Sequence, residues 1–166
     1  MGYPPPPPPP LSVTVASLAP ADEDDWRALW AGYCAYNQAS VPEEVTADVW
    51  RRVLTQGDST RGMIARDQLG RAVGLLHYVL HPNTWGTVPV CYLEDLFTAP
   101  DVRGRGVGRT LIETLVARAR EAGWSRVYWH TDEGNHVARA LYDRVTGGRD
   151  KLVRYVISLS PTRTVA

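Results

Sequence analysis

The feature that most constrains the fold is a β-α-β pattern between residues 88 and 131. Residues 88–98 are mostly apolar and predict a strand, and the loop after them holds three arginines and three glycines between Arg103 and Arg109. From Gly106 onward, apolar residues recur at helical spacing until Gly123, where the helix is expected to end. Residues 124–131 predict the next strand. Two strands joined by a helical crossover are expected to be parallel.

The rest of the chain adds strands and helices around this unit. Hydrophobic alternation predicts strands, acidic residues after a proline predict helix starts, and the turn at 67–70 predicts a hairpin. We expect an α/β fold of the α+β kind, with a mixed central sheet of about six to seven strands and about four helices. The further predicted elements are strands over 11–16, 63–66, 72–80 and 152–159, and helices over 20–33, 43–54 and 135–144.

Length and composition favour one folded domain with a tail. The 166 residues, 44% hydrophobic and 22% charged, predict a single domain over 11–166 that can bury a core. Residues 1–10 contain the run Pro4 to Pro10 and predict a disordered proline-rich tail. The alternative is a ligand for an SH3-type domain.

Several classes of function are disfavoured. The net charge is zero, which argues against nucleic-acid binding, and no apolar run approaches the roughly 20 residues of a membrane span. Cys34 and Cys91 with four scattered histidines do not form a metal site. In a strand, His77 and His81 would lie about 13 Å apart on one face. The first residues have neither the basic segment nor the apolar helix of a secretory signal, so we expect a cytoplasmic protein.

The loop over 103–109 predicts a phosphate site. Glycines let the backbone approach a ligand, successive N–H groups make a nest for an anion, and the helix N-terminus attracts negative charge. A P-loop would need a lysine here, and a dinucleotide-binding fingerprint would space its glycines differently. We therefore expect a pyrophosphate at this loop.

These residues resemble a known family. Arg103-x-x-Gly106-x-Gly108 after an apolar strand resembles the acetyl-CoA signature of the GCN5-related N-acetyltransferases (GNAT), and Asn135-x-x-Ala138-x-x-Leu141-Tyr142 resembles their second motif. The segments 92–97 and 129–131 are most similar to the branch with yeast histone/polyamine-type and D-amino-acid acetyltransferases.

The resemblance implies the GNAT fold and acetyl-CoA as co-substrate, with no metal. In such proteins the strands at 88–98 and 124–131 splay into a V that holds the pantetheine arm. The residues it places on acetyl-CoA are Leu96, Phe97, Thr98, Arg103, Gly104, Arg105, Gly106, Val107, Gly108, Arg109, Thr110, Asn135, Ala138 and Tyr142. Asn135 also suits the N-cap of a helix.

The expected reaction is direct transfer of the acetyl group to a primary amine. Family members use a tyrosine at the position of Tyr142 to protonate the leaving thiolate; the alternative is a core aromatic residue. Glu94 and Asp95 would point to opposite faces unless a bulge intervenes. Glu94 is the first choice for the base and Asp95 the second, and the alternative is a salt bridge to a nearby arginine.

The acceptor is expected to be a small amine or amino acid. Residues 1–83 hold nine acidic and six basic residues, whereas residues 84–166 hold nine and twelve, which suits a cationic acceptor near the first helices. Trp30, Tyr33 and Trp85 could add an aromatic surface, with Glu94 beside it. Polyamines, protein lysine tails, or a CoA-binding regulatory module without turnover are the alternatives. The family and the predicted final strand, exposed at an edge, favour a homodimer.

Overall fold

The computed structural model describes residues 8–159 of the 166-residue chain. It divides into two compact units, one that ends at His130 and one that begins at Thr131. The first unit holds the sheet and most helices, and the second holds a single helix in its described part. Most of the predicted proline-rich tail, residues 1–7, lies outside the described residues.

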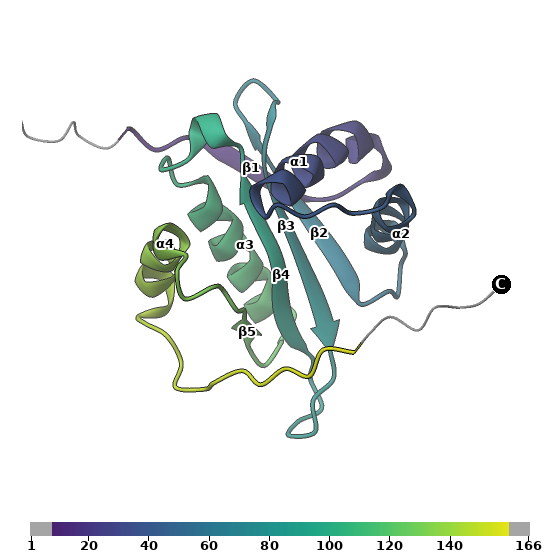
Figure 1. Cartoon of the computed structure of the whole chain (residues 1–166), viewed down its shortest axis with the longest axis vertical. Coiled ribbons are helices and arrows are strands. Elements are labelled where there is room, and N and C mark those ends of the chain that lie inside the picture. The colour runs from purple at the N-terminus through teal and green to yellow at the C-terminus, as the bar shows by residue number, and fades with distance from the viewer. Residues whose placement is uncertain (1–7, 160–166) are drawn as a thin grey trace, which may run out of the picture. The chain divides into compact units, whose positions relative to one another are not determined.

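The five strands of the first unit form one sheet in chain order (Figure 1). The first four strands are antiparallel neighbours, and the fifth pairs parallel to the fourth. The predicted mixed, mostly antiparallel sheet and the parallel crossover pair are therefore confirmed. The strands are β1 (Val13–Ser17), β2 (Thr60–Asp67), β3 (Ala72–His81), β4 (Val90–Thr98) and β5 (Val127–Tyr128).

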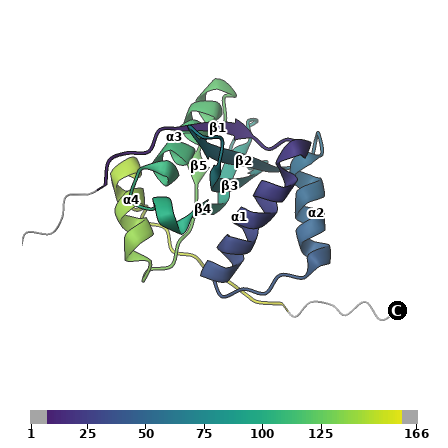
Figure 2. The ribbon, with the colours of Figure 1, turned by 90° about the horizontal axis from the view of Figure 1, so that it is seen from above.

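Helices cover both faces of this sheet (Figure 2). α1 (Glu23–Tyr36), which follows a 3-10 turn at Pro20–Asp22, and α2 (Glu43–Leu54) pack on one face. α3 (Val107–Glu121), which follows a second 3-10 turn at Pro100–Val102, packs on the other. Burial of large side chains between α1, α2 and the sheet is the main source of stability on their face. This cluster contains Leu18, Trp26, Leu29, Trp50, Val53, Ile64, Leu75 and Phe97.

The loop over residues 103–109, called the glycine-arginine loop below, leads into α3 as predicted. Its apolar stripe, with Val107, Leu111 and Leu115, is buried against the sheet. Gly74 of β3 lies under this stripe, and a Cβ added there would come within 2.9 Å of Val107 and Leu111. The helix thus approaches the sheet closely at its first turns, which places the loop beside the end of β4.

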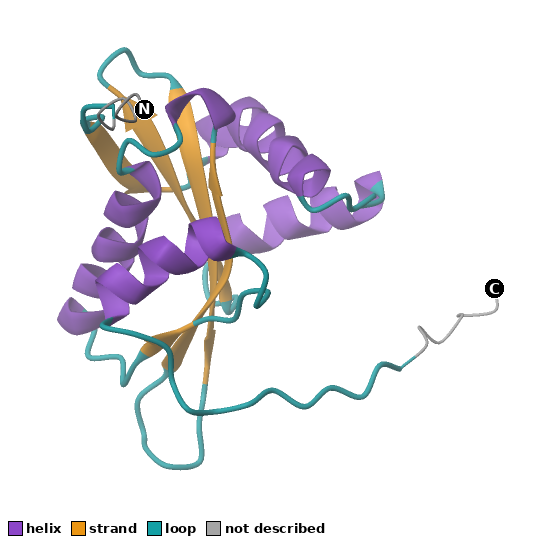
Figure 3. Ribbon diagram, turned by 60° about the vertical axis from the view of Figure 1, so that its left-hand side comes forward, coloured by secondary structure: helices purple, strands orange, loops and turns teal. Residues whose placement is uncertain are grey.

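Two predictions about strands are wrong, and a third predicted strand is shorter than expected. The described residues form five strands rather than six or seven, and residues 152–159 form none (Figure 3). A strand exists only through hydrogen bonds to a neighbour, and Tyr155 and Ile157 in this segment are 91% and 88% exposed. Only Val127 and Tyr128 of the predicted strand over 124–131 pair, because the chain leaves the sheet after Tyr128.

The second unit contains α4 (His136–Thr146), close to the predicted helix over 135–144. Asn135 is its N-cap, and its side-chain oxygen accepts a hydrogen bond from the backbone N–H of Ala138 at 3.3 Å. The helix ends at Gly147, whose φ of 81° lies in the left-handed region. The N-cap role expected for Asn135 is confirmed.

Candidate active site

A β-bulge in β4 controls which side chains reach the α1 face of the sheet. His77 of β3 pairs with Asp95, but the next residue, Tyr78, pairs with Leu93, so Glu94 is the extra residue. Tyr92 pairs with Val79, which lies on the same face as His77. Tyr92 and Asp95 therefore share one face although they are three positions apart. Glu94 is exposed, whereas Asp95 is mostly buried, with 15% of its side chain exposed.

Asp95 is held by a buried chain of hydrogen bonds. The indole Nε1 of Trp26 donates to Nε2 of His77 at 2.8 Å, and Nδ1 of His77 lies 2.9 Å from Oδ2 of Asp95. Because an indole N–H can only donate, Nε2 accepts, and the neutral imidazole carries its hydrogen on Nδ1. Trp26 is 0% and His77 2% exposed. This arrangement fixes the orientation of the carboxylate.

Sequence reasoning missed the role of His77, which it treated only as a possible partner of His81. In a strand whose other inward side chains are apolar, a lone histidine needs buried partners. That requirement, together with a tryptophan on the first helix, was the available signal. Within the described residues, the side-chain partner of Asp95 is thus His77 of β3 rather than a nearby arginine, which was the alternative expected from the sequence.

An aromatic wall lies beside this chain. Trp30 stacks on Tyr33 with ring centroids 5.6 Å apart, and Trp30 lies 5.5 Å from the ring of His77. Tyr33 meets Phe97 edge to face. Burial, and then the charge of Asp95, raise the pKa of Cys34 on the same helix. Trp85 does not join this group, because it lies in the loop between β3 and β4 and is 96% exposed.

The loop before α3 has the backbone shape of an anion site. Gly104 and Gly106 have φ values of 75° and 90°, and a Cβ added at either would meet no atom within 4 Å. Gly106 is the N-cap of α3, so the first N–H groups of the helix have no acceptor within it. These N–H groups and the helix dipole favour a negatively charged group such as phosphate at this position.

The three arginines of the loop have different partners. Arg103 donates from Nε to the Thr98 carbonyl oxygen at 3.2 Å, and its guanidinium lies over the rings of Tyr36 and Phe97. Arg105 donates from Nε to the Pro9 carbonyl at 3.2 Å, and its own carbonyl accepts from the Leu11 N–H at 2.8 Å.

Arg109 pairs with Glu113, one turn further along α3, at 2.7 Å. All three arginines thus surround the loop but bind protein groups. Thr110 also uses its hydroxyl within the helix, donating to the Gly106 carbonyl at 3.2 Å.

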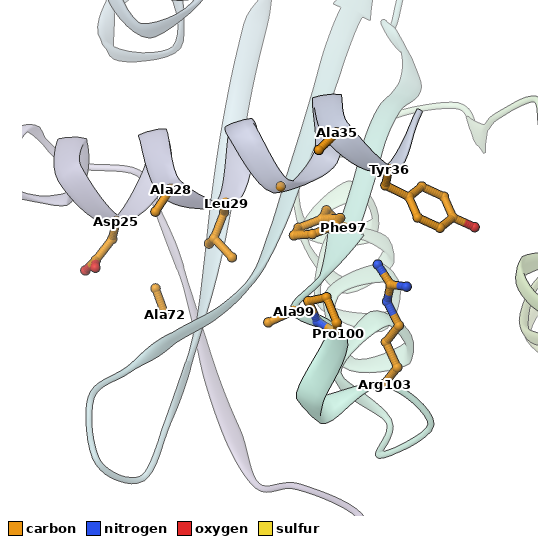
Figure 4. A pocket seen from close by; sticks show the side chains of 11 residues that line it. Asp25, Ala28, Leu29, Ala35, Tyr36, Ala72, Phe97, Ala99, Pro100 and Arg103 are labelled. Carbon is orange, nitrogen blue, oxygen red and sulfur yellow. The ribbon is translucent and has the colours of Figure 1, made fainter. Parts of the chain in front are cut away.

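A pocket of about 480 Å³ lies between α1 and the end of β4 (Figure 4). Small side chains of α1 form one wall, and Phe97 and Pro100 form the other. A Cβ added at Gly32 would lie 2.9 Å from Phe97, so the glycine allows the helix to pack this closely. Arg103 closes one end, so the pocket borders the glycine-arginine loop.

Beyond the bulge, one edge of β4 lacks a strand neighbour in the described part of the chain. Pairing with β5 covers only Cys91 with Val127 and Tyr92 with Tyr128, whereas pairing with β3 continues to Thr98. The residues of β4 that follow Tyr92, including Leu96, therefore have no strand neighbour on the β5 side, and the Thr98 carbonyl accepts from Nε of Arg103 instead. Such an edge can pair with amide groups of a ligand.

The predicted residues of the second unit share one side of α4. Asn135, Ala138 and Tyr142 are three and four positions apart, and all three are half-buried. The Tyr142 carbonyl accepts from the Thr146 hydroxyl at 2.9 Å.

Residues 8–159 contain no group of three or more His, Cys, Asp or Glu side chains suited to hold a metal ion. None of their helices is long and apolar enough to cross a membrane.

Comparison with known proteins decides the family. The sequence profile of the acetyltransferase (GNAT) family matches residues 24–147, which include strands β2 to β5, the loop and α4. The chain belongs to the GNAT family. It is therefore an acyltransferase of the N-acetyltransferase type, and its fold is the GNAT fold. Enzymes of this family take their acetyl group from acetyl-CoA.

Individual relatives agree with this assignment. The GNAT chain is 36% identical over 142 residues to the D-amino-acid N-acetyltransferase HPA3 of Saccharomyces cerevisiae, covering 85% of this chain and 88% of the relative. Its fold matches the ribosomal-protein-alanine N-acetyltransferase of Brucella melitensis biovar Abortus 2308, with a TM-score of 0.73, 24% identity and coverage of 90% and 100%. It also matches AAC(6')-Iy in complex with a bisubstrate CoA analogue, with a TM-score of 0.72, 20% identity and coverage of 89% and 99%.

Proposed function

We propose that the protein transfers the acetyl group of acetyl-CoA directly to the primary amine of a small molecule, an amine or an amino acid. The observation that carries this proposal is the bulge in β4, which places Glu94 and Asp95 just beyond the last residue that pairs with β5. The glycine-arginine loop follows the end of the same strand. The similarity to a yeast D-amino-acid N-acetyltransferase supports an amino acid as the acceptor.

For acetyl-CoA, we assign the pyrophosphate to the loop and the first turn of α3. The backbone of Gly104 to Gly108 and the hydroxyl of Thr110 provide donors, and the three arginines provide charge once they exchange their present partners. The free edge at Leu96, Phe97 and Thr98 pairs with the pantetheine amides. A backbone N–H near Leu96 polarises the thioester carbonyl. When bound, acetyl-CoA supplies the activated acetyl group and the thiolate that leaves.

For the acceptor, Glu94 and Asp95 attract the ammonium group. Asp95 is oriented by His77, and Glu94 reaches the exposed side of the bulge. Among the carboxylates, Glu94 is the first candidate to remove a proton from the amine. Trp30 and Tyr33 flank the side on which Asp95 lies and can contact the cation or the rest of the acceptor. Trp85 would contact only the outer part of a larger acceptor.

Tyr142 is assigned as the general acid that protonates the leaving thiolate. An unperturbed phenol has a pKa of about 10, and a tyrosine can therefore donate a proton to a thiolate. Asn135 and Ala138, on the same side of α4, are assigned to contacts with CoA. The resemblance of this helix to the second family motif supports both assignments.

Two further assignments concern the whole protein. We propose a homodimer, the arrangement expected from the family resemblance. We also propose a cytoplasmic location, which suits the free thiols of Cys34 and Cys91.

The test is a screen of amines with a reagent that detects the thiol of released CoA. D- and L-amino acids, polyamines and lysine peptides form the panel, and we expect turnover with an amine or amino acid. Tyr142→Phe should lower kcat about 10²-fold, whereas Tyr155→Phe, at a 91% exposed position, should not. Calorimetric binding of acetyl-CoA with no CoA release for any amine would instead identify a regulatory module.

A further inference from the structure

Four aromatic rings gather where β4 and β5 separate. The ring of Tyr92 lies 5.1 Å from Tyr128 and 5.5 Å from His130, measured between centroids. His81 of β3 meets Tyr128 edge to face at 5.9 Å. The cluster adjoins the last paired residues of β4 and β5, Tyr92 and Tyr128, and His130 follows two positions later.

The histidines of this face differ in the use of their ring nitrogens. Nδ1 of His81 lies 2.9 Å from the Pro82 carbonyl, which can only accept, so Nε2 accepts from the Tyr128 hydroxyl at 2.9 Å. His77 also uses both nitrogens and is buried. Neither ring can exchange a proton with a ligand without losing a partner.

His130 is different. Its Nδ1 lies 3.3 Å from the Tyr92 hydroxyl, its ring is exposed, and its Nε2 has no hydrogen-bond partner within residues 8–159. The titratable groups whose rings contact it are Tyr92 on β4 and Tyr128 on β5, and Tyr128 in turn contacts His81 and Arg126, whose guanidinium lies 5.6 Å from the centre of the Tyr128 ring. None of these groups takes up Nε2.

The position of this pair fits the proposed reaction. Tyr92 and Asp95 point to the same face of β4, roughly 10 Å apart along the strand. The edge that β5 leaves free begins after Tyr92, and the proposed site of the thioester near Leu96 lies further along it, next to Asp95. Tyr92 and His130 border the start of this edge, on the face of β4 to which Asp95 and Glu94 attract the amine.

We propose that His130, positioned by Tyr92, accepts the proton that the acceptor ammonium must lose before it attacks. This rests on the proposed function and leaves Glu94 to attract the cation. The ammonium gives one proton to Nε2 of His130, which passes it to water. The neutral amine then forms the C–N bond as the C–S bond breaks. Tyr142 gives a proton to the leaving thiolate, and the second proton lost by the nitrogen restores the phenol of Tyr142. The products are an N-acetyl compound, CoA and one proton.

The chemistry favours imidazole over carboxylate for this step. An unperturbed histidine has a pKa of about 6.5 and a glutamate about 4.3, and a base works best when its pKa is near the operating pH. The two assignments predict different pH profiles for kcat/KM of the acceptor. With an imidazole base, kcat/KM decreases as the pH falls below neutral, and we call this decrease the acid limb of the profile. With a carboxylate base the acid limb lies about two pH units lower.

The test measures this profile between pH 5 and 9, roughly spanning the titration of a histidine, with an amine that the wild-type enzyme acetylates. His130→Gln should lower kcat about 10²-fold at neutral pH and remove the acid limb, with the KM for acetyl-CoA unchanged. Tyr92→Phe should keep the limb but shift its midpoint, as expected for a positioning residue. His136→Gln, an exposed histidine of α4, is the matched control and should keep both rate and limb.

Two outcomes overturn the proposal alone. One is a His130→Gln enzyme that retains the wild-type rate and limb. The other is a limb that disappears in Glu94→Gln and persists in His130→Gln. Absence of turnover by the wild-type enzyme with every amine would be a failure of the proposed function itself, so the two failures are distinguishable.

Discussion

Nδ1 of His77 lies 2.9 Å from Oδ2 of Asp95, and the opposite nitrogen of the same ring accepts from Trp26. His77 of β3 thus orients the carboxylate of Asp95 on β4. The hydrogen bond from Trp26 of α1 determines that Nδ1 of His77 is the nitrogen that donates to it. The bulge at Glu94 is needed for this contact, because it brings Asp95 opposite His77. The orientation of the proposed acceptor site therefore depends on the buried side chain of His77.

Replacing His77 should affect both stability and acceptor binding. His77→Phe leaves the buried N–H of Trp26 without an acceptor and Asp95 without a donor, which we expect to cost about 1–3 kcal/mol for an unsatisfied buried group. Urea unfolding would measure this loss, and kinetics should show a higher KM for the amine. His81→Phe, on the same strand and face but less buried, is the matched control and should cost less.

Removing the charge of Asp95 should weaken acceptor binding selectively. In Asp95→Asn the amide oxygen can still accept from His77, so the fold should persist. Hydrogen bonds to charged groups contribute about 1.5–3 kcal/mol, which corresponds to an increase of about 10- to 100-fold in the KM of the amine. The KM for acetyl-CoA should not change. Asp48→Asn, on the exposed side of α2, should leave both constants unaltered, and an equal effect there would contradict a specific role for Asp95.

A side chain at Gly106 should disturb the loop rather than the core. Gly106→Ala places a Cβ on a residue with φ of 90°, at a cost of about 1–2 kcal/mol, and should raise the KM for acetyl-CoA. Gly86→Ala is the comparison, because its φ lies outside the left-handed range and its added Cβ meets nothing within 4 Å. Calorimetric titration with CoA on both variants would measure the difference. Equal affinities would show that the loop backbone does not bind the phosphates.

Alkaline pH should destabilise the fold through Cys91. Burial raises the pKa of its thiol from 9.0 to about 12, so between these values the unfolded chain loses a proton that the folded chain keeps. This contribution to stability is complete below pH 9 and decreases as the pH rises toward 12, by up to about 1.4 kcal/mol per unit. Denaturant unfolding as a function of pH should show a shallower decline in Cys91→Ala. Parallel curves for the two proteins would exclude the thiol as the cause.

Local patterns were sufficient to predict the centre of the fold. The loop at 103–109, the start of α3 and the N-cap at Asn135 depend on glycine, arginine and capping residues close together in the chain. The hairpin of β2 and β3 likewise follows from alternation around one turn. For these elements, the structure agrees with the prediction from sequence in both position and type.

The features that the sequence could not predict depend on distant pairing. The bulge at Glu94 arises from the register between β3 and β4, which no single segment specifies. The role of His77 needs Trp26, which is 51 positions away. The alternating apolar pattern of 152–159 predicted a strand, but alternation shows only that a segment can pair, and no neighbour pairs with it in the described structure.

The hydrogen bonds that join Pro9 and Leu11 to Arg105 have a practical consequence. They bring the start of the described chain to the loop that we assign to acetyl-CoA, across more than half the length of the sequence. A fluorescent label attached at residue 8 would lie next to that loop. Its emission would make this segment an optical reporter of ligand binding.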